Sequence, residues 1–584
     1  MMRIPLCIEA LGAEDTYDVV VVGAGGGGLA AALFAADMGQ RVLVVERTEF
    51  VGGTTALSGG TLWIPNSQQC RQASLPDSCE DAAEYLRQTV GEQTSEELRN
   101  AFLRNGPLAL ARLEEISALK FVLRPHYPDY FPGAKGFTST GRALGAVAFD
   151  GKRLGQLLHV VRPPIPEFTV FGGMAVDRSD VQHLLCVGRS AKSFLHVAKL
   201  LSAYAWDRLT LGRSARLVLG GALIGGLLDG IARAGVDLLL RTRVNKIEMR
   251  EGRVSSVEVE AGSTIRRLNV SKGLILASGG FNRSHDLRST LLPNSVPIYS
   301  ATAEGTTGEM HRMATAIGAA HSRNNRTPAF WAPVSCRRRA DGSTAVFPHL
   351  LLDRGKPRIL AVNASGRRFV NEAVSYHAFV NAMFANDGGC TNVPAFLVTD
   401  SEGLRRYGLG LVRPRTRRLS PLLRDGYLTR ASTLRELALK LGIDPMGLVE
   451  TVERMNASAE KGSDSEFRRG DDPYGVFLGD AEHRPNPCLG PLDTPPFFAV
   501  RLYPGDIGAA TGLRTDARAR VLGRDSKPID GLYACGNDMS SVMGGAYAGP
   551  GITLGPAIAF AFVAARDAVS SHCVPNEQTE EESS

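Results

Sequence analysis

Short apolar runs flanking a glycine cluster predict the first structured unit of the chain. Residues 19–22 are four consecutive valines, which is typical of a strand buried on both faces. The glycine cluster at 23–28 is followed by an alanine-rich stretch, 29–38, that predicts a helix. The apolar run 42–45 predicts a second strand. Together these elements predict a βαβ unit of about 30 residues.

The later apolar pattern alternates between helical and strand periods. Helices are predicted within 75–119 and over 217–232. Strands are predicted at 236–240, 244–249, 254–260 and 273–277.

Residues 152–216 are open to two interpretations. The stretch 194–201 is amphipathic and has the basic neighbours Arg189, Lys192 and Arg208. One interpretation is a helical insertion packed on the core. The other is a surface for a membrane or an apolar ligand.

The middle of the chain changes in composition, which indicates a second domain inserted into the first. Proline and arginine become more frequent there, and the predicted strands are short. We expect an N-terminal part of the first domain at 14–322, an inserted domain at 323–490, a C-terminal part at 491–573, and a disordered tail at 574–584.

Composition and charge narrow the class of protein. The 584 residues carry 66 basic and 60 acidic side chains, and a net charge of +6 is too weak to indicate a nucleic-acid partner. The nine cysteines are scattered without a C-x-x-C pair, so we expect reduced thiols and no metal site. No apolar run reaches 18 residues, and the stretch 1–17 is too polar for a signal peptide. We therefore expect a cytoplasmic protein, with 152–216 as the candidate for peripheral membrane contact.

Three glycines form a G-x-G-x-x-G motif between the predicted strand and helix, which is the context that this motif requires. Gly23 permits the tight turn, Gly25 lets the backbone approach a pyrophosphate, and Gly28 allows close helix–strand packing. The helix N-terminus offers N–H groups to the phosphate. Glu46, at the end of the second strand, is placed to accept hydrogen bonds from ribose hydroxyls. The motif in this context predicts a dinucleotide site.

Three later features favour FAD as the dinucleotide. Residues 52–60 are small or carry hydroxyls, which suits the flavin end of an extended dinucleotide, and 277–280 (A-S-G-G) end a predicted strand. Residues 530–537 (D-G-L-Y-A-C-G-N) precede a helix expected from about Gly551. Here the chain resembles the C-terminal fingerprint of flavoprotein oxidoreductases of the succinate dehydrogenase and fumarate reductase superfamily. The resemblance implies that this helix points its N-terminus at the flavin, where its dipole stabilises reduced flavin.

The expected fold class is α/β, with a Rossmann-like FAD-binding domain and an inserted α+β catalytic (cap) domain. Covalently flavinylated members of the superfamily carry a histidine in the loop after the acidic strand end. Residues 47–62 contain none, so we expect non-covalent FAD. The expected cofactor-binding residues are Gly23, Gly25, Gly26, Gly28, Glu46, Arg47, Gly53, Thr54, Thr55, Ser58, Gly59, Val244, Ala277, Gly279, Gly536, Asn537, Thr553 and Leu554.

At three places, in order along nearly the whole chain, the sequence resembles the 3-ketosteroid Δ1-dehydrogenase family. Residues 127–130 (Y-P-D-Y) match the P-D-Y segment of that family. Residues 366–372 (G-R-R-F-V-N-E) are followed by Tyr376. Residues 541–544 (S-V-M-G) are followed by 547–551 (Y-A-G-P-G), which match Y-x-G-x-G.

This resemblance implies FAD-dependent 1,2-dehydrogenation of a 3-ketosteroid to a 1-ene-3-one. It implies that C1 gives a hydride to flavin N5, and that Tyr376 takes the C2 proton with support from Tyr130. The Tyr547 hydroxyl and the Gly551 N–H would polarise the C3 carbonyl in the manner of an oxyanion hole. A free phenol has a pKa of roughly 10, so Tyr376 needs help to act as a base.

The expected partners are a 3-ketosteroid or a steroid-like triterpenoid ketone and an electron acceptor that the sequence does not identify. Three alternatives stay open. A fumarate-reductase-like enzyme would use Arg367, Arg368 and His377 to bind a dicarboxylate. A 3-ketosteroid dehydrogenase acting at C4–C5 shares the same frame. A non-enzymatic escort protein for apolar chains shares it as well, but such proteins lack an intact flavin fingerprint.

Overall fold

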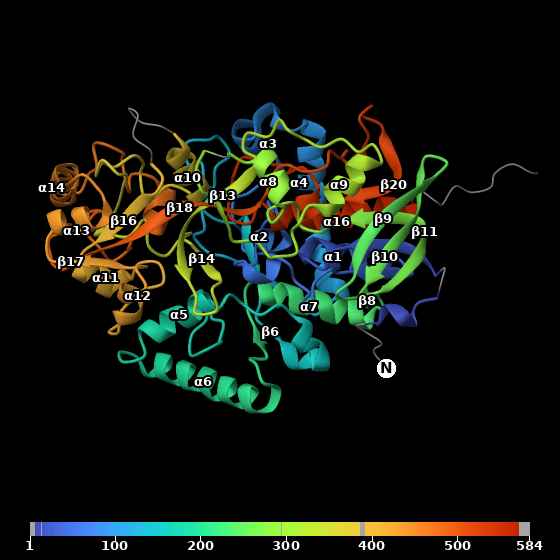
Figure 1. Ribbon diagram of the computed structural model, residues 1–584, viewed down its shortest axis with the longest axis horizontal. Helices are drawn as coiled ribbons and strands as arrows, with labels where there is room; N and C mark the ends of the chain where they lie inside the picture. Colours follow the sequence, from blue (N-terminus) through green and yellow to red (C-terminus); the bar gives the residue numbers. More distant parts are fainter. Residues whose placement is uncertain (1–5, 13–14, 294, 386–391, 571–584) are drawn as a thin grey trace, which may run out of the picture.

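The computed structural model describes residues 6–12, 15–293, 295–385 and 392–570 of the chain. The predicted tail 574–584 lies outside these described residues. Two large sheets, each with its own helices, form most of the molecule (Figure 1). The mixed α/β class expected from the sequence is confirmed.

The first sheet has eight strands and contains the predicted βαβ unit. Its strands are β1 (Thr16–Val22), β2 (Val42–Val45), β8 (Asp237–Leu239), β9 (Arg243–Arg250), β10 (Arg253–Ala261), β11 (Thr264–Leu276), β19 (Arg520–Leu522) and β20 (Pro528–Ala534). Strand β1 lies between β2 and β11 and runs parallel to both. Strand β20 continues the parallel order beside β11. The central strands are buried because they have neighbours on both edges and helices on their faces.

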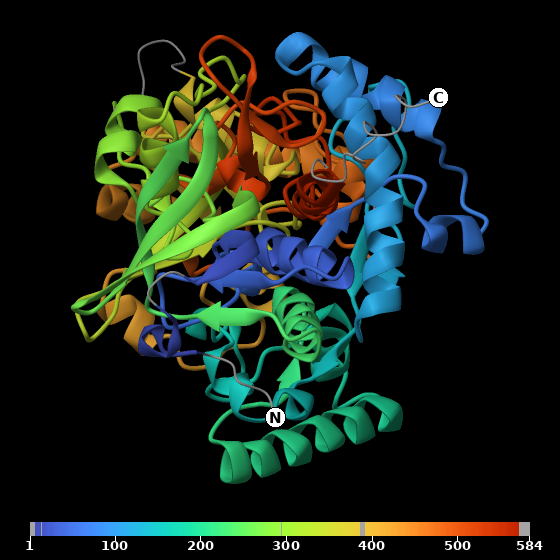
Figure 2. The same cartoon turned by 90° about the vertical axis from the view of Figure 1, so that its right-hand side faces the viewer.

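Helices without a polar face cover this sheet. They are α1 (Gly26–Asp37), α7 (Gly220–Arg233) and α16 (Leu554–Ser570), with the longer α4 (Glu96–Ile116) packed on α16. Helix α1 lies between α7 and α16 and is buried over most of its length (Figure 2). Its small alanines and glycines let these neighbours approach closely, and a helix apolar on all sides is a buried one. The predicted region 75–119 forms α3 (Cys79–Thr89) and α4.

The second sheet has seven strands in the order β14-β13-β18-β16-β15, with β12 and β17 also paired to β18. They are β12 (Tyr299–Ser300), β13 (Ala329–Arg338), β14 (Thr344–Pro348), β15 (Ile359–Val362), β16 (Ala395–Thr399), β17 (Thr429–Ala431) and β18 (Phe497–Ala509). The domain limits 323–490 stay a prediction, but this sheet extends beyond both of them, to β12 and β18. A change in composition does not tell which strands share a sheet, because strand pairing joins segments that are distant in the chain.

Smaller elements complete the second unit and the space between the sheets. Helices of the second unit include α10 (Tyr376–Phe384), α11 (Ser401–Tyr407), α13 (Leu434–Leu441), α14 (Pro445–Lys461) and α15 (Pro473–Leu478). A three-stranded sheet consists of β4 (Phe121–Leu123), β5 (Ala143–Ala146) and β3 (Thr61–Trp63).

The segment 152–216 is helical and lies at the rim of the molecule, where α5 (Arg178–Leu185) packs on α6 (Ala191–Leu211) (Figures 1 and 2). The inner face of α6 buries Ser193, Val197 and Asp207. Its outer side exposes apolar side chains, namely Phe194, Leu195, Trp206 and Leu209. No helix in the described part of the chain is long and apolar enough to cross a membrane.

Candidate active site

The glycines of the turn between β1 and α1 have two roles: some are needed for packing, and one leaves space for a ligand. Gly23 has φ +107°, and a Cβ there would lie 2.4 Å from the Ala277 carbonyl oxygen. A Cβ on Gly28 would lie 1.9 Å from the Gly23 carbonyl oxygen. A Cβ on Gly25, by contrast, would meet nothing within 4 Å. The first and third glycines are therefore required by the fold, whereas the second faces open space at the N-terminus of α1.

Glu46 lies beside this turn and is buried. Its Oε2 accepts a hydrogen bond from the Ala24 N–H at 2.9 Å. Its Oε1 accepts from the N–H of Thr48 at 2.9 Å and from the Thr48 hydroxyl at 2.8 Å. The carboxylate that the sequence assigns to the ribose is thus held against the glycine turn.

The hydroxyl-rich segment after β2 reaches the same turn. The Thr55 hydroxyl accepts from the Gly26 N–H at 3.2 Å. The Thr54 hydroxyl accepts from the Ala303 N–H at 3.0 Å, and a Cβ built on Gly53 would lie 3.5 Å from the Cα of Gly25. Thr54, Thr55 and Gly53 therefore border the open space at the turn.

Two further residues of this segment differ in their surroundings. The Ser58 hydroxyl donates to the Thr55 carbonyl oxygen at 2.8 Å and accepts from the Gly60 N–H. Gly59 is exposed. The structure therefore gives Ser58 a local hydrogen-bonding role at Thr55 and places Gly59 at the surface.

Val244 lines a separate surface cleft of about 240 Å³. Its lining residues are Arg243, Val244, Asn245, Glu309, Arg312 and Met313. Arg47 forms an ion pair with Glu309 at 3.0 Å, which links the end of β2 to this cleft. The structure thus connects the two residues that the sequence could only assign separately.

Asp538, which sequence reasoning missed, ties together two predicted cofactor loops. Its carboxylate accepts from the N–H and hydroxyl of Ser278 and from the N–H of Gly280, in the loop after β11. It also lies 3.2 Å from Nε2 of His311. Burial by itself raises the pKa of Asp538, but the hydrogen bonds from His311 and Ser278 outweigh it and hold that pKa below its usual value. An acidic residue directly after G-N at a strand end was the signal that could have revealed it.

These two loops carry Ala277, Gly279, Gly536 and Asn537, and a cavity follows them. It is lined by Gly536, Asn537 and Thr553 together with residues 539–542 and the first turn of α16. Leu554 is the first residue of α16, three positions later than the expected start at Gly551. Gly551 cannot be helical because its φ is +94°.

The described residues therefore fit a bound FAD. The open space at Gly25 and the buried Glu46 are features that a dinucleotide needs for its pyrophosphate and ribose. At the flavin end, a small cavity of about 20 Å³ lies at the N-terminus of α16. These features line up along the carboxyl ends of the parallel strands, where ligands bind in open α/β sheets.

Three tyrosines meet beside this region, although they are far apart in the chain. The hydroxyls of Tyr130 and Tyr376 lie 3.3 Å apart. The ring of Tyr547 stacks on Tyr130 with centroids 5.5 Å apart and lies edge-on to Tyr376 at 5.0 Å. All three side chains are buried. The fold thus brings together the three phenols that the sequence assigned to catalysis.

The P-D-Y segment is held by its own aspartate. Asp129 accepts from Nε1 of Trp63 and from Arg142, both at 2.7 Å. Burial raises the pKa of Asp129 to about 6, although Arg142 opposes that shift. The N–H of Tyr130 donates to the Ala548 carbonyl oxygen at 2.9 Å, which fixes Tyr130 against the segment of Tyr547.

Burial makes each phenol reluctant to ionise. It raises the pKa of Tyr130 and of Tyr376 well above the ordinary value, and that of Tyr547 to about 12. The hydrogen bond from Tyr130 lowers the pKa of Tyr376 in part. A base at this position therefore requires further stabilisation of its charged form.

Gly551, four residues after Tyr547 in the chain, presents a free donor. A Cβ at this position would lie 2.4 Å from the Thr61 carbonyl oxygen, so only glycine fits. The Gly551 carbonyl oxygen accepts from the N–H of Trp63 at 3.1 Å. Within the described ranges, no acceptor binds the Gly551 N–H. This N–H is available for a ligand oxygen.

Tyr474 is a fourth phenol that no motif revealed. It lies in α15, its ring centroid is 4.7 Å from that of Tyr130, and it is buried. Its hydroxyl has no hydrogen-bond partner among the described residues. Only the packing of α15 on the 127–130 segment places it here.

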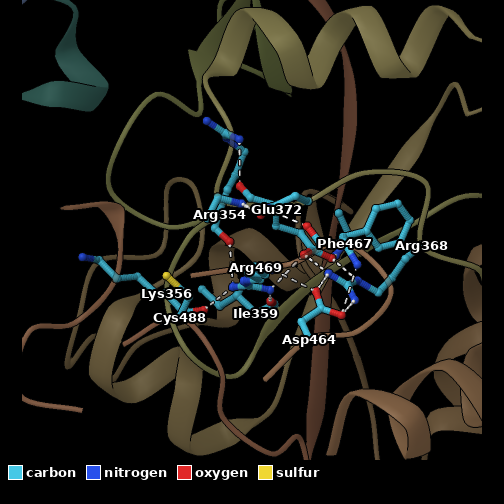
Figure 3. A network of polar contacts seen from close by, with 12 residues as sticks. Arg354, Lys356, Ile359, Arg368, Glu372, Asp464, Phe467, Arg469 and Cys488 are labelled. Carbon is cyan, nitrogen blue, oxygen red and sulfur yellow. Dashed lines mark hydrogen bonds and ion pairs between the residues drawn. The ribbon is translucent and has the colours of Figure 1, made fainter. Parts of the chain in front are cut away.

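The residues of the fumarate-reductase alternative have other partners. Arg368 is buried and bridges Glu372 and Asp464, at 2.8 Å to each (Figure 3). Nδ1 of His377 accepts from the Trp331 N–H at 3.1 Å, and burial lowers the pKa of His377 to about 3. Arg367 is exposed and lies 3.4 Å from Glu450. These contacts are structural and form no clamp for a dicarboxylate.

Comparisons with known proteins give the class of the chain. Residues 18–554 match the family model described as FAD binding domain. The chain is 35% identical to a 3-oxosteroid 1-dehydrogenase of Mycolicibacterium smegmatis over 94% of this chain and 97% of that protein. It is 34% identical to a 4-oxocyclohex-2-ene-1-carboxylate 5-dehydrogenase of Sinomonas cyclohexanicum, over 94% and 93%. The protein is thus an FAD-dependent oxidoreductase.

A solved structure narrows the class further. The crystal structure of the 3-ketosteroid Δ1-dehydrogenase from Sterolibacterium denitrificans, in complex with 1,4-androstadiene-3,17-dione, superposes with a TM-score of 0.88. It is 34% identical and covers 95% of this chain and all of that chain. A 3-ketosteroid-Δ4-(5α)-dehydrogenase from Rhodococcus jostii shares the fold alone, with a TM-score of 0.63 and 21% identity. The chain belongs to the 3-ketosteroid Δ1-dehydrogenase family.

Proposed function

We propose that this protein catalyses 1,2-dehydrogenation of a 3-ketosteroid and yields a 1-ene-3-one. The observation that carries the proposal is the buried contact between the Tyr130 and Tyr376 hydroxyls, with the ring of Tyr547 5.0 Å from that of Tyr376. The free N–H of Gly551 follows four residues after Tyr547 in the chain. Family membership supports it, because relatives over nearly the full chain are 3-oxosteroid 1-dehydrogenases.

The residues divide the chemistry between them. The Tyr547 hydroxyl and the Gly551 N–H donate to the C3 carbonyl oxygen and stabilise the negative charge that develops there. The phenol oxygen of Tyr376 takes the C2 proton, and Tyr130 supports it by a hydrogen bond. When bound, FAD supplies at N5 the acceptor for the hydride that leaves C1. Two C–H bonds break, and the C1–C2 double bond forms.

For the cofactor, we propose non-covalent binding by the predicted set. Gly25 and Gly26 face the pyrophosphate, Glu46 the ribose, and Gly536 and Asn537 the flavin end. Val244 lines the outer cleft, and Arg47 is linked to it by the ion pair with Glu309. Support comes from the open space at Gly25 and from the cavity lined by Gly536, Asn537 and Thr553.

A second candidate substrate class is a single-ring ketone that carries a carboxylate. It is favoured by the 34% identity to a 4-oxocyclohex-2-ene-1-carboxylate dehydrogenase, which is close to the identity with the steroid enzymes. The aromatic lining of the site favours a flat apolar substrate instead, because aromatic rings pack well against apolar surface.

The deciding experiment is anaerobic. The visible spectrum of the purified, FAD-loaded protein is recorded before and after addition of androst-4-ene-3,17-dione, and in parallel with 4-oxocyclohexanecarboxylate. Bleaching of the flavin band by the steroid alone, with a 1,4-diene product, is the expected result. Bleaching by the single-ring ketone alone would show that the substrate is a single-ring keto acid and not a 3-ketosteroid. No bleaching by either compound would count against the proposal.

We also propose that the outer side of α6 contacts a bilayer with anionic lipids. Phe194, Leu195, Trp206 and Leu209 are exposed there, together with Lys192, Lys199 and Arg208. The one acidic residue of the helix, Asp207, is buried and paired with Lys152 at 3.2 Å. Apolar side chains with cations and no exposed carboxylate suit a negatively charged interface.

A further inference from the structure

Arg354 is a buried arginine whose guanidinium is bound only by backbone carbonyls. Nε donates to the carbonyl oxygen of His349 at 2.9 Å, and the terminal nitrogens donate to those of Leu350 at 3.1 Å, Glu372 at 3.0 Å and Val374 at 3.3 Å. The side chain is 2% exposed. Figure 3 shows Arg354 next to Glu372. Four neutral acceptors satisfy its donors without neutralising its charge.

The charge has no carboxylate in contact. Within the described ranges, no carboxylate oxygen lies within ion-pair distance of the Arg354 guanidinium. The adjacent Asp353 is directed elsewhere, because Oδ2 binds Nδ1 of His349 at 2.6 Å and the Gly410 N–H at 3.0 Å. Buried charges in proteins are normally paired, so an unpaired one requires an explanation.

The other buried carboxylates near Glu372 bind other arginines. The Glu372 carboxylate is shared by Arg368 at 2.8 Å and Arg469 at 3.0 Å, and Asp464 is bound by Arg368. Glu466 reaches Arg368 only from the surface, at 3.7 Å. The buried carboxylate that acts on Arg354 is therefore Asp353, from beyond ion-pair distance.

The Arg354 guanidinium lies at the start of α10, the helix that begins at Tyr376. Two of the carbonyls that bind it, those of Glu372 and Val374, come four and two residues before Tyr376, and it lies 5.0 Å from the ring centroid of Phe379, one turn further along α10. Burial lowers the pKa of Arg354, and the ionisable groups that oppose this shift are Tyr474, Asp353, Tyr130 and Tyr376.

The other groups that face Tyr376 bring no positive charge. They are the phenols of Tyr127, Tyr130 and Tyr547. His377, the next residue, stays neutral because burial lowers its pKa to about 3. Arg354 is thus the cation among the ionisable groups described around this phenol.

We propose that Arg354 is a positioning residue that stabilises the phenolate of Tyr376 by its buried positive charge and holds the start of α10 through the carbonyls of Glu372 and Val374. The inference rests on the proposed role of Tyr376 as the base. A desolvated phenol ionises only when a nearby positive charge offsets the cost of burial. A guanidinium held by carbonyls keeps that charge because guanidinium does not deprotonate in proteins.

The test follows the ultraviolet absorption of tyrosinate in the full-length, FAD-loaded protein as the pH rises. Each variant is also made with Tyr376→Phe added. The difference between the two titration curves then gives the titration of Tyr376 alone. In Arg354→Met the pKa of Tyr376 is expected to rise by at least about one unit, which means tenfold less phenolate at a given pH. Arg354→Lys keeps the charge and is expected to titrate close to the wild type.

Glu372→Gln makes the opposite change in charge. It tests the proposal even if the Arg354→Met variant does not fold. It removes a negative charge and keeps the backbone carbonyl, so the pKa of Tyr376 is expected to fall. Loosened packing cannot produce opposite shifts in these two variants. The matched control is Arg213→Met, because Arg213 also donates to two backbone carbonyls and its pKa is lowered by burial alone. It is expected to leave the Tyr376 titration unchanged.

Unchanged Tyr376 titration in Arg354→Met, or the absence of a downward shift in Glu372→Gln, would overturn the proposal. A shift of equal size in Arg213→Met would overturn it as well. Because the titration needs no steroid, it is independent of the substrate test. A protein with the expected shifts but no reaction with the steroid would disprove the substrate class and leave the role of Arg354 standing.

Discussion

At the scale of single residues, the site depends on groups whose ordinary chemistry is changed by burial. Tyr376, Tyr130 and Tyr547 are held together by packing, which raises their pKa values. His377 is kept neutral by the same effect. Each of these shifts predicts how a conservative variant will differ from the wild type.

Tyr376→Phe is expected to slow flavin reduction by the steroid by roughly 10²- to 10⁴-fold, the usual contribution of a positioned base. The ring and its packing remain, so FAD content should not change. Anaerobic rapid mixing measures the rate of bleaching, and Tyr299→Phe, outside the cluster, is the matched control. A variant that keeps a rate close to the wild type would remove Tyr376 from the mechanism.

His377 predicts a pH dependence of stability. Its folded pKa of about 3 lies below the ordinary value of 6.5, so its contribution is complete above pH 6.5 and is lost as the pH falls toward 3. His377→Asn keeps an acceptor for the Trp331 N–H and removes the titration. The slope of unfolding free energy against pH should then decrease by up to about 1.4 kcal/mol per pH unit in this range. Denaturation at several pH values measures it, and the exposed His285→Asn should leave the slope as it is.

At the scale of elements, the turn between β1 and α1 shows that glycines of the same motif can have different structural roles. A Cβ on Gly28 would overlap the carbonyl oxygen of Gly23, whereas a Cβ on Gly25 would meet nothing within 4 Å. The sequence assigned these roles from the motif, and the structure gives the physical distinction between them.

Gly25→Ala and Gly28→Ala should therefore separate binding from folding. Gly25→Ala is expected to change the stability of the FAD-free protein by no more than about 0.5 kcal/mol, because its methyl group meets open space, but to weaken FAD binding at least ~10-fold. Gly28→Ala is expected to cost about 1–3 kcal/mol of stability, since its methyl group overlaps a carbonyl. Thermal melting and quenching of flavin fluorescence measure the two effects. Equal effects of both substitutions on FAD binding and on melting would contradict this division.

At the scale of the whole molecule, the two sheets and the rim helix have different tasks. The first sheet provides the proposed cofactor site, the second carries Tyr376 on α10, and α6 lies outside both (Figures 1 and 2). An apolar substrate dissolves in membranes, so a helix that contacts the bilayer would bring the enzyme to its substrate.

We expect a variant with four serine substitutions, at Phe194, Leu195, Trp206 and Leu209, to lose the apolar contact. Its co-sedimentation with vesicles of phosphatidylglycerol and phosphatidylcholine should fall by ~10-fold or more. High salt should weaken wild-type binding by screening the cations. Serine at the exposed Ile265 and Leu439 is the control. Equal sedimentation of the two sets would count against membrane contact by α6.

Much of the local structure could be predicted from the sequence because it depends on neighbours in the chain. The valine run, the glycine turn and the alanine-rich stretch became β1, its turn and α1, as expected. The helix was expected from residue 29 and begins at Gly26, because glycines at a helix start look like a loop in a pattern of apolar residues. The place of β18 in the second sheet was not predictable from composition, since strand pairing joins distant segments.

The sequence by itself determined the nucleotide fold and the cofactor class, since periodicity, turn glycines and short motifs are local properties. It also predicted the three tyrosines, through a resemblance that short motifs carry. Only the tertiary structure decided which groups surround those tyrosines. Tyr474, Asp538 and Arg354 belong to no motif, and they reach the site through the packing of segments far apart in the chain. Burial, which sets the charge and pKa of each group, exists only once those segments are packed together.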